Sequence, residues 1–274
     1  MSRAAAVVGG GTMGAGIAHV LLAAGDRVTV AEAGDERAAA ARDAVARSLR
    51  RAEERGKLDG TADELLRNLD VVPATSRLPR DTQLVIEAVP EDVPLKQRVL
   101  ADVRAACPDA LLASNTSSLS VRQLGDDVIG MHFFNPVPVQ VLLELVVHDG
   151  LSAGQVAAAR EWAESLGKTV IEVRDSPGFA TSRLGVAVGM EAIRMLEEGV
   201  ASAEDIDTGM RLGYGWPMGP LRLTDLVGLD VRLSIAEHLT RELGPRFTPP
   251  ELLRNKVARG ELGRKTGRGF FDWD

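Results

Sequence analysis

Apolar and polar residues alternate along the first 175 residues in blocks that predict strands followed by helices. Ala4–Val8 predicts a short buried strand, Thr12–Ala24 a helix with apolar residues at helical spacing, and Arg27–Glu32 a second strand. Together they have the size of a parallel strand–helix–strand unit. The same alternation predicts further strands at Leu69–Val72, Gln83–Val89, Ala110–Ser114, Val128–His132, Val139–Val147 and Thr169–Val173, with helices at Leu95–Ala106 and from Ser152 to Leu166. This pattern is typical of a doubly wound α/β sheet.

Two parts of the chain depart from that alternation. Residues 35–70 are charged and helix-rich with a break at Gly56–Gly60, which predicts a helical hairpin inserted between strands. Beyond the turn-rich junction Arg174–Gly178 the pattern is almost entirely helical. Helices are predicted at Ser182–Glu198, after a capping motif at Ser202–Asp205, within Leu221–Leu243 and at Glu251–Arg259, and Phe270–Phe271 fits a short strand. We therefore expect an α/β domain over residues 1–178 and a helical domain over 179–274.

Composition narrows the class of protein. The 274 residues carry a net charge of −7 and 45% apolar residues, values of an ordinary globular chain. No apolar run approaches the roughly 18 residues of a membrane helix, and the apolar start is too short for a signal peptide. Cys107 is the single cysteine, so no intrachain disulfide can form. We expect a cytoplasmic protein with neither a membrane nor a nucleic-acid partner.

The segment from Gly9 to Gly14 matches the pattern G-x-G-x-x-G between a predicted strand and helix. In a dinucleotide-binding loop the first glycine makes a tight turn, the second admits the pyrophosphate, and the third lets helix and strand pack closely. Glu32, 18 residues beyond Gly14, ends the second strand. A carboxylate there accepts hydrogen bonds from a ribose 2′-hydroxyl and repels a 2′-phosphate, which favours NAD over NADP. The residues expected to bind NAD in this Rossmann-like domain are Gly9, Gly11, Thr12, Met13, Gly14 and Glu32.

Three polar groups follow or lie within later predicted strands. His132 ends one strand, which places it at the edge of the sheet where ligands bind, although a packed core histidine fits equally well. Glu144 lies in an apolar strand, where a carboxylate needs a partner such as histidine unless its strand is an exposed edge. The polar run Ser114–Ser118 has two interpretations. It forms either a turn that hydrogen-bonds its own backbone or, at the same sheet edge as His132, a set of hydroxyls that bind a substrate oxygen. No metal site is expected.

These segments resemble the short-chain L-3-hydroxyacyl-CoA dehydrogenases, including the bacterial 3-hydroxybutyryl-CoA dehydrogenases. The resemblance runs nearly end to end and in the family's order. It is carried by the segments Gly9–Ala18, Ser114–Leu119, His132–Pro138, Asp175–Phe179, Tyr214–Pro220 and Leu262–Phe270. It implies a homodimer formed through the helical C-terminal domain and an acyl-CoA substrate.

The resemblance also implies a role for each matching residue. His132 corresponds to the catalytic base, Glu144 to its carboxylate partner, and Ser117 to the serine that hydrogen-bonds the substrate oxygen. Glu91 and Lys96 correspond to positions near the nicotinamide half of the cofactor. The implied reaction is the reversible oxidation of an (S)-3-hydroxyacyl-CoA by NAD⁺ to a 3-ketoacyl-CoA.

The inserted hairpin corresponds to the element that helps bind coenzyme A in the family. Ser48 and Arg55 fall within it, and Lys57 adds to a local excess of basic charge that suits a phosphate, although a solvated helix face would show the same excess. Ser182 stands where the family commonly has asparagine, so a shorter, rotating hydroxyl replaces a fixed amide near the substrate.

Two other functions remain open on the sequence. A related dehydrogenase could act on a non-CoA hydroxy acid, such as a sugar acid or a carnitine-like compound. A catalytically silent NAD-binding protein is disfavoured by the intact set His132, Glu144 and Ser117.

Overall fold

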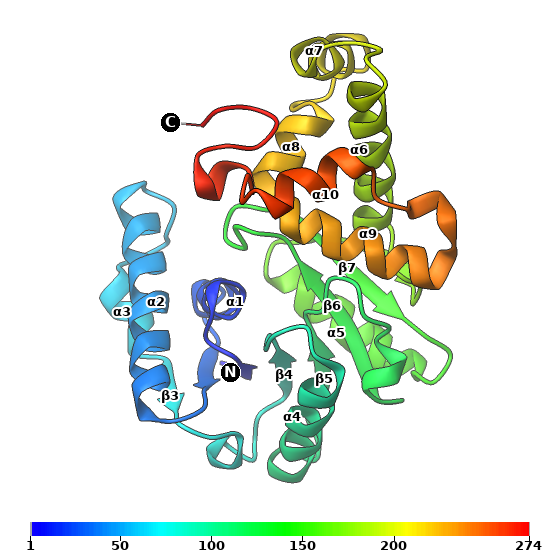
Figure 1. The fold of residues 1–274 in the computed structure, drawn as a ribbon. Coiled ribbons are helices and arrows are strands. Elements are labelled where there is room, and N and C mark those ends of the chain that lie inside the picture. Colours follow the sequence, from blue (N-terminus) through cyan, green and yellow to red (C-terminus); the bar gives the residue numbers. More distant parts are fainter. Residues whose placement is uncertain (1, 274) are drawn as a thin grey trace. The chain divides into compact units, whose positions relative to one another are not determined.

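The computed structural model describes residues 2–273, and the chain divides into two compact units, Met1–Asp175 and Ser176–Asp274 (Figure 1). The first unit is built on one large sheet, whereas the second consists of helices joined by short loops. No helix among residues 2–273 has the length and apolar character needed to cross a membrane.

The sheet of the N-terminal unit has eight strands in the order β3-β2-β1-β4-β5-β6-β7-β8. Neighbouring strands are parallel except β6 and β7, which pair antiparallel. The predicted doubly wound α/β fold is therefore confirmed. The strands are β1 (Ala4–Val8), β2 (Arg27–Ala31), β3 (Leu69–Val72), β4 (Leu84–Glu87), β5 (Leu111–Ser114), β6 (Val128–Phe133), β7 (Leu142–Val147) and β8 (Thr169–Arg174).

The central strands are mainly apolar because residues on both faces of the sheet are buried. Every residue of β1, β4 and β6 is buried. The helices of this unit are α1 (Thr12–Ala23), α2 (Asp35–Glu54), α3 (Ala62–Leu66), α4 (Val93–Ala106) and α5 (Ala153–Ser165). The predicted cap at Ser152 is confirmed, since its hydroxyl accepts from the backbone N–H of Gln155 at the start of α5.

The chain reverses its direction of winding at β1. Strand β2 lies on one side of β1, while β4 lies on the other. In open α/β sheets, such a switch point leaves a crevice outside the carboxyl ends of the two central strands. Here those ends lead into the loop after Val8 and into the segment after Glu87, so both segments face the crevice.

The inserted hairpin forms with arms of unequal length. Helix α2 has 20 residues and ends before the predicted break, whereas α3 has only five. The short arm is fixed by a capping box in which Thr61 and Glu64 bond each other's backbone N–H groups. Helix α2 packs against α1.

The strand predicted at Val139–Val147 is wrong at its start, because β7 begins only at Leu142. The ammonium of Lys168 donates to the carbonyls of Val137 and Gln140, both at 2.7 Å. These carbonyls are therefore bound by a buried side chain instead of a strand ladder, and residues 134–141 form a loop.

The C-terminal unit contains α6 (Thr181–Glu197), α7 (Ala203–Gly213), α8 (Pro220–Val227), α9 (Leu229–Leu243) and α10 (Glu251–Ala258). The predicted cap at Ser202 is confirmed, because its hydroxyl accepts from the N–H of Asp205. The helical region predicted over Leu221–Leu243 is split at Gly228, whose φ of 104° favours glycine and ends α8.

The short strand predicted at Phe270–Phe271 does not form. Only isolated bridges, Gly263 to Arg268 and Arg268 to Asp272, occur there. The fully buried carboxylate of Asp225 accepts from the backbone N–H groups of Phe270 and Phe271 at 2.8 and 2.9 Å. These amides therefore bond a side chain from α8 instead of a neighbouring strand.

Candidate active site

The loop from Gly9 to Gly14, here called the glycine loop, joins β1 to α1. Gly9 has a φ of 99°, a conformation that disfavours residues with a side chain. A Cβ at Gly14 would lie 1.7 Å from the carbonyl oxygen of Gly9, so only glycine allows the loop to pack against the helix. Gly11 caps α1 without any side-chain hydrogen bond. The N–H groups of the first turn can therefore bind an anion.

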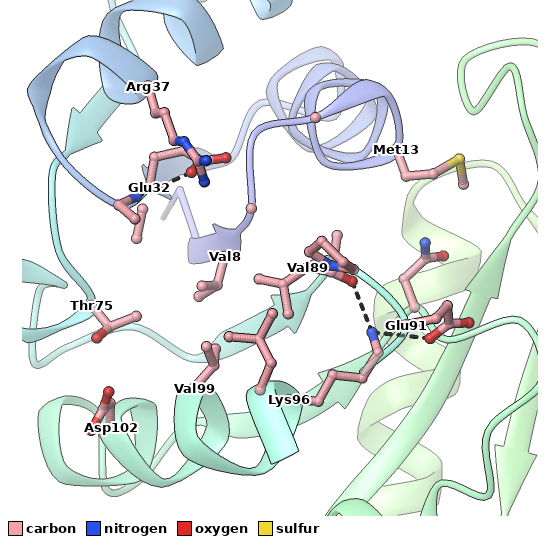
Figure 2. A pocket seen from close by; sticks show the side chains of 18 of the residues that line it. Val8, Met13, Glu32, Arg37, Thr75, Val89, Glu91, Lys96, Val99 and Asp102 are labelled. Carbon is pink, nitrogen blue, oxygen red and sulfur yellow. Dashed lines mark hydrogen bonds and ion pairs between the residues drawn. The ribbon is translucent and has the colours of Figure 1, made fainter. Parts of the chain in front are cut away.

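A pocket of about 810 Å³ opens beside the glycine loop, at the carboxyl ends of β1 and β4 (Figure 2). It brings together Gly9, Gly11, Thr12, Met13, Glu32, Glu91, Lys96 and Ser117, all of which the sequence singled out. Gly14 is not among the lining residues, but it allows the glycine loop to pack closely against α1. The lining of the pocket comes from the N-terminal unit alone, and mainly apolar side chains such as Val8, Val89 and Val99 form its walls.

The Glu32 carboxylate is held at one end of this pocket. Its Oε1 accepts from the N–H of Gly10 at 2.6 Å, and Oε2 accepts from the N–H of Ala33 at 3.1 Å. These bonds fix the carboxylate while leaving lone pairs for a ligand hydroxyl. Arg37, in the first turn of α2, also lines the pocket and is labelled in Figure 2. Arg37 was not predicted as a site residue, because a charged residue in a first helical turn carries no distinctive signal.

A buried ion pair supports the opposite wall. Glu87, the last residue of β4, is fully buried, and its Oε1 lies 2.8 Å from Nζ of Lys96. The hydroxyl of Ser114 donates to the other carboxylate oxygen at 2.6 Å, and the N–H of Val89 donates to Oε1. Lys96 is 1% exposed and also donates to the Val89 carbonyl. The ammonium therefore stabilises the pocket wall through several partners, and Glu87 is a functional candidate that sequence reasoning missed.

Glu91 connects this ion pair to Ser117. Its Oε2 lies 3.3 Å from Nζ of Lys96, and a dashed line in Figure 2 marks this ion pair. Its Oε1 accepts from the Thr116 hydroxyl at 2.9 Å and from the Ser117 N–H at 2.7 Å. The polar segment after β5 is therefore hydrogen-bonded to Glu91 in the pocket wall, and Ser117 itself lines the pocket.

His132 and Glu144 are direct partners in the antiparallel pair of β6 and β7. Nδ1 of His132 lies 2.7 Å from Oε2 of Glu144, and the exposed fractions of the two residues are 5% and 0%. Strand β7 lies between β6 and β8, so Glu144 is not on an exposed edge strand. The imidazole also packs against the ring of Phe134, with centroids 4.6 Å apart.

Asn115 places this pair next to the pocket. Its side chain lines the pocket, and its Oδ1 accepts from the N–H of Phe133, the neighbour of His132, at 2.9 Å. The end of β6 is thus bonded to the pocket wall. A histidine hydrogen-bonded to a buried carboxylate beside a pocket is an arrangement suited to general acid–base chemistry.

The predicted hairpin residues lie outside this pocket. Ser48 is half-buried, and its hydroxyl lies 2.8 Å from Nδ1 of His19 on α1. Arg55 and Lys57 are exposed where α2 ends and the loop begins. Burial lowers the pKa of His19 to about 4, so this histidine is neutral at pH 7. Ser182 belongs to the C-terminal unit, in the first turn of α6, where it is half-buried.

Comparison with known proteins places both units in one family. Residues 4–176 match the family model of the 3-hydroxyacyl-CoA dehydrogenase NAD-binding domain, and residues 178–273 match the C-terminal domain of the same family. A curated 3-hydroxybutyryl-CoA dehydrogenase of Mycobacterium tuberculosis is 44% identical over 97% of each chain. A probable 3-hydroxybutyryl-CoA dehydrogenase of Bacillus subtilis is 40% identical over 98% of this chain and 96% of its own.

Solved structures agree with the sequence relatives. The crystal structure of M. tuberculosis FadB2 superposes with a TM-score of 0.94 at 41% identity, covering 100% of this chain and 99% of the other. The (S)-3-hydroxybutyryl-CoA dehydrogenase of Ralstonia eutropha superposes with a TM-score of 0.93 at 38% identity, covering all of both chains. The chain therefore belongs to the 3-hydroxyacyl-CoA dehydrogenase family, with an N-terminal domain of the type that binds NAD.

Proposed function

We propose that the protein catalyses the reversible, NAD-dependent oxidation of (S)-3-hydroxyacyl-CoA, with 3-hydroxybutyryl-CoA as a substrate, to the 3-ketoacyl-CoA. The observation that carries this proposal is the buried His132–Glu144 pair at the end of β6, bonded through Asn115 to the pocket beside the glycine loop. The relatives at 40–44% identity bear names of this activity.

The residues around the pocket fit a dinucleotide. The uncapped first turn of α1 offers N–H groups to a pyrophosphate, and nothing lies within 4 Å of the position of a Cβ on Gly11. Glu32 is positioned to accept hydrogen bonds from a ribose hydroxyl and to repel a 2′-phosphate. Glu91 and Lys96 line the far part of the pocket. Bound NAD⁺ supplies the hydride acceptor of the reaction.

His132 acts as the general base in this proposal. Donation from Nδ1–H to Glu144 leaves the lone pair of Nε2 to take the proton from the C3 hydroxyl of the substrate. The buried carboxylate then stabilises the imidazolium that forms. In the reverse direction the same imidazolium returns the proton to the C3 oxygen. Ser117 orients that oxygen, and its backbone is fixed by Glu91.

The hairpin is proposed to hold the coenzyme A part of the substrate. Ser48 has its hydroxyl fixed by His19, and the exposed Arg55 and Lys57 provide positive charge for a phosphate. Replacing acetoacetyl-CoA by the corresponding pantetheine thioester tests this role. We expect kcat/KM to fall by about tenfold or more. Equal rates would favour a related dehydrogenase that acts on a non-CoA hydroxy acid.

We also propose a cytoplasmic homodimer formed through the domain over residues 179–274, while residues 1–178 bind the cofactor. Large apolar side chains exposed on the C-terminal unit support the dimer, namely Leu184, Val200, Leu212, Tyr214, Leu226, Val227 and Val231. In the proposed dimer these side chains would be removed from water, which favours association. Light scattering after size-exclusion chromatography is expected to give twice the chain mass of 29.2 kDa. A monomer at micromolar concentration would contradict the dimer.

A further inference from the structure

The pocket beside the glycine loop continues past Glu32 toward the segment that follows β3. The backbone N–H of Glu32 donates to the carbonyl of Val72, and that of Gly34 donates to the carbonyl of Pro73, both at 3.0 Å. Residues 73–75 therefore lie along the end of β2, where they line the pocket. A dinucleotide whose adenosine ribose bonds Glu32 places its adenine at this end, because the base and the pyrophosphate are attached to opposite sides of the ribose.

Helix α4 forms a wall along this pocket. Lys96, Val99 and Asp102 follow one another at intervals of three residues, and all three line the pocket. Side chains at this spacing are neighbours on a helix surface, and six residues span about 9 Å of helix. Lys96 is the member of this row that pairs with Glu91, so Asp102 is the member farthest from Glu91 along the helix. Figure 2 draws Asp102 and Thr75 at the end of the pocket away from Glu91.

Arg37 and Asp102 contribute opposite charges to this end of the pocket. Both side chains are exposed, and among residues 2–273 neither makes a hydrogen bond or an ion pair, not even with the other. A ligand group bound between them therefore needs an N–H donor for the carboxylate and a flat face for the guanidinium. Adenine offers both, because its 6-amino group is a donor and nucleic-acid bases stack on the planar guanidinium of arginine.

We propose that Asp102 accepts a hydrogen bond from the 6-amino group of the cofactor's adenine and that Arg37 covers the face of the ring, so that the protein selects adenine over a 6-oxo purine. Hypoxanthine carries an acceptor oxygen where adenine carries this donor, and it therefore presents lone pairs to the Asp102 carboxylate. The inference goes beyond the proposed reaction, because it concerns the base of the cofactor and involves no acyl substrate. It rests on the assignment of NAD to this pocket.

Two dinucleotides that differ only in the purine base test the proposal. The probes are NADH and reduced nicotinamide hypoxanthine dinucleotide, and isothermal titration calorimetry with the full-length protein gives the Kd of each without any turnover. We expect the Kd of the hypoxanthine form to be about tenfold higher, as for the loss of one hydrogen bond to a charged group. A ratio of the two Kd values below about three, or tighter binding of the hypoxanthine form, would overturn the proposal.

The variant Asp102→Asn assigns this preference to one side chain. Asparagine offers an oxygen to the 6-amino group and an N–H to the 6-oxo group, so we expect the ratio of the two Kd values to fall to about one. Asp109→Asn is the matched control, because Asp109 is exposed in the turn after α4 and outside the pocket lining, and this variant should keep the wild-type ratio. A wild-type ratio in Asp102→Asn would contradict the assigned contact.

The variant Arg37→Met distinguishes the second contact from the first. Methionine removes the guanidinium that covers the ring, whichever purine is bound, so both Kd values should rise by about three- to fivefold while their ratio stays unchanged. Arg47→Met, at an exposed position farther along α2, should leave both Kd values unchanged. Wild-type affinity for both dinucleotides in Arg37→Met would remove Arg37 from the proposal.

The outcomes separate this inference from the assignment on which it rests. If the wild-type protein binds NADH but binds the hypoxanthine form equally well, only the selection of adenine is overturned. If protein shown to be folded binds neither dinucleotide, the assignment of NAD to the pocket fails as well. The wild-type comparison needs no variant, so it remains decisive whatever the substitutions do to folding.

Discussion

His132 and Glu144 face each other across β6 and β7, with Nδ1 of the imidazole 2.7 Å from Oε2 of the carboxylate. Both residues lie inside regular strands, and the carboxylate is fully buried. The hydrogen bond therefore fixes the ring orientation before any substrate binds. An imidazole whose Nδ1 is bonded to a buried carboxylate suits the general base of the proposed alcohol dehydrogenation.

Replacing His132 by glutamine tests this role directly. Glutamine retains hydrogen-bonding groups but cannot take a proton near neutral pH, so we expect kcat to fall by about 10²–10⁴-fold. Tryptophan fluorescence titration should show NADH binding within about threefold of the wild type, because His132 does not line the pocket. His148→Gln is the matched control in the same unit and should retain turnover. Near-normal kcat in His132→Gln would remove His132 from the mechanism.

Glu32 is expected to determine the choice between the two nicotinamide cofactors. Glu32→Ala removes the acceptor for a ribose hydroxyl and the repulsion of a 2′-phosphate. The KM for NADH should rise by about tenfold, and the preference for NADH over NADPH should fall by at least that factor. Glu36→Ala, an exposed neighbour on α2, should change neither value. If Glu32→Ala leaves the preference unchanged, the discrimination lies elsewhere in the pocket.

The Glu87–Lys96 pair predicts a strong coupling in stability. Glu87→Gln leaves a buried ammonium without its nearest carboxylate, so the free energy of unfolding should fall by about 3–5 kcal/mol. In the double variant Glu87→Gln/Lys96→Met the loss should be clearly smaller than the sum of the two single losses. Urea denaturation of the four proteins measures this coupling.

The exposed pair Arg27–Asp81 provides a control for that cycle. Both of its side chains are more than half exposed, so the coupling between Arg27→Ala and Asp81→Ala should stay below about 1 kcal/mol. Additive losses at Glu87 and Lys96 would show that the buried pair contributes no specific interaction to the pocket wall.

His19 gives a defined dependence of stability on pH. Its pKa is lowered from 6.5 to about 4 in the folded protein, so between these values the unfolded chain binds a proton that the folded chain does not. Stability from this group is therefore present above pH 6.5 and is lost as the pH falls toward 4. Between pH 8 and pH 5 the loss should be about 2 kcal/mol.

The variant His19→Gln isolates that contribution. Glutamine can bond the Ser48 hydroxyl but does not titrate. Between pH 8 and pH 5, the free energy of unfolding of the variant should therefore fall by about 2 kcal/mol less than that of the wild type. Urea denaturation at the two pH values measures the difference. Parallel pH dependence in both proteins would show that His19 is not held neutral by burial.

The features that the sequence predicted best are those whose residues are close together along the chain. The glycine loop needs only a strand, a turn and a helix in succession, and Glu32 follows at the end of the next strand. Glu87 was missed because its partners, Lys96 and Ser114, come from a helix and from another strand. A buried apolar strand also gives no sign of its direction, so the antiparallel pairing of β6 and β7 could not be read from the pattern.

Hydrogen bonds between backbone groups and side chains distant in the sequence explain the errors in the predicted secondary structure. Phe270 and Phe271 have the composition of a strand, but their amides bond Asp225, 45 and 46 residues away.

Oxidation of NADH by acetoacetyl-CoA, followed by absorbance with the purified wild-type protein and run beside NADPH, tests the central claim most directly. The proposed function predicts rapid, enzyme-dependent loss of NADH and a much slower loss of NADPH. Faster use of NADPH would contradict the role assigned to Glu32. No oxidation of either cofactor by protein shown to be folded would contradict the proposed 3-hydroxyacyl-CoA dehydrogenase activity itself.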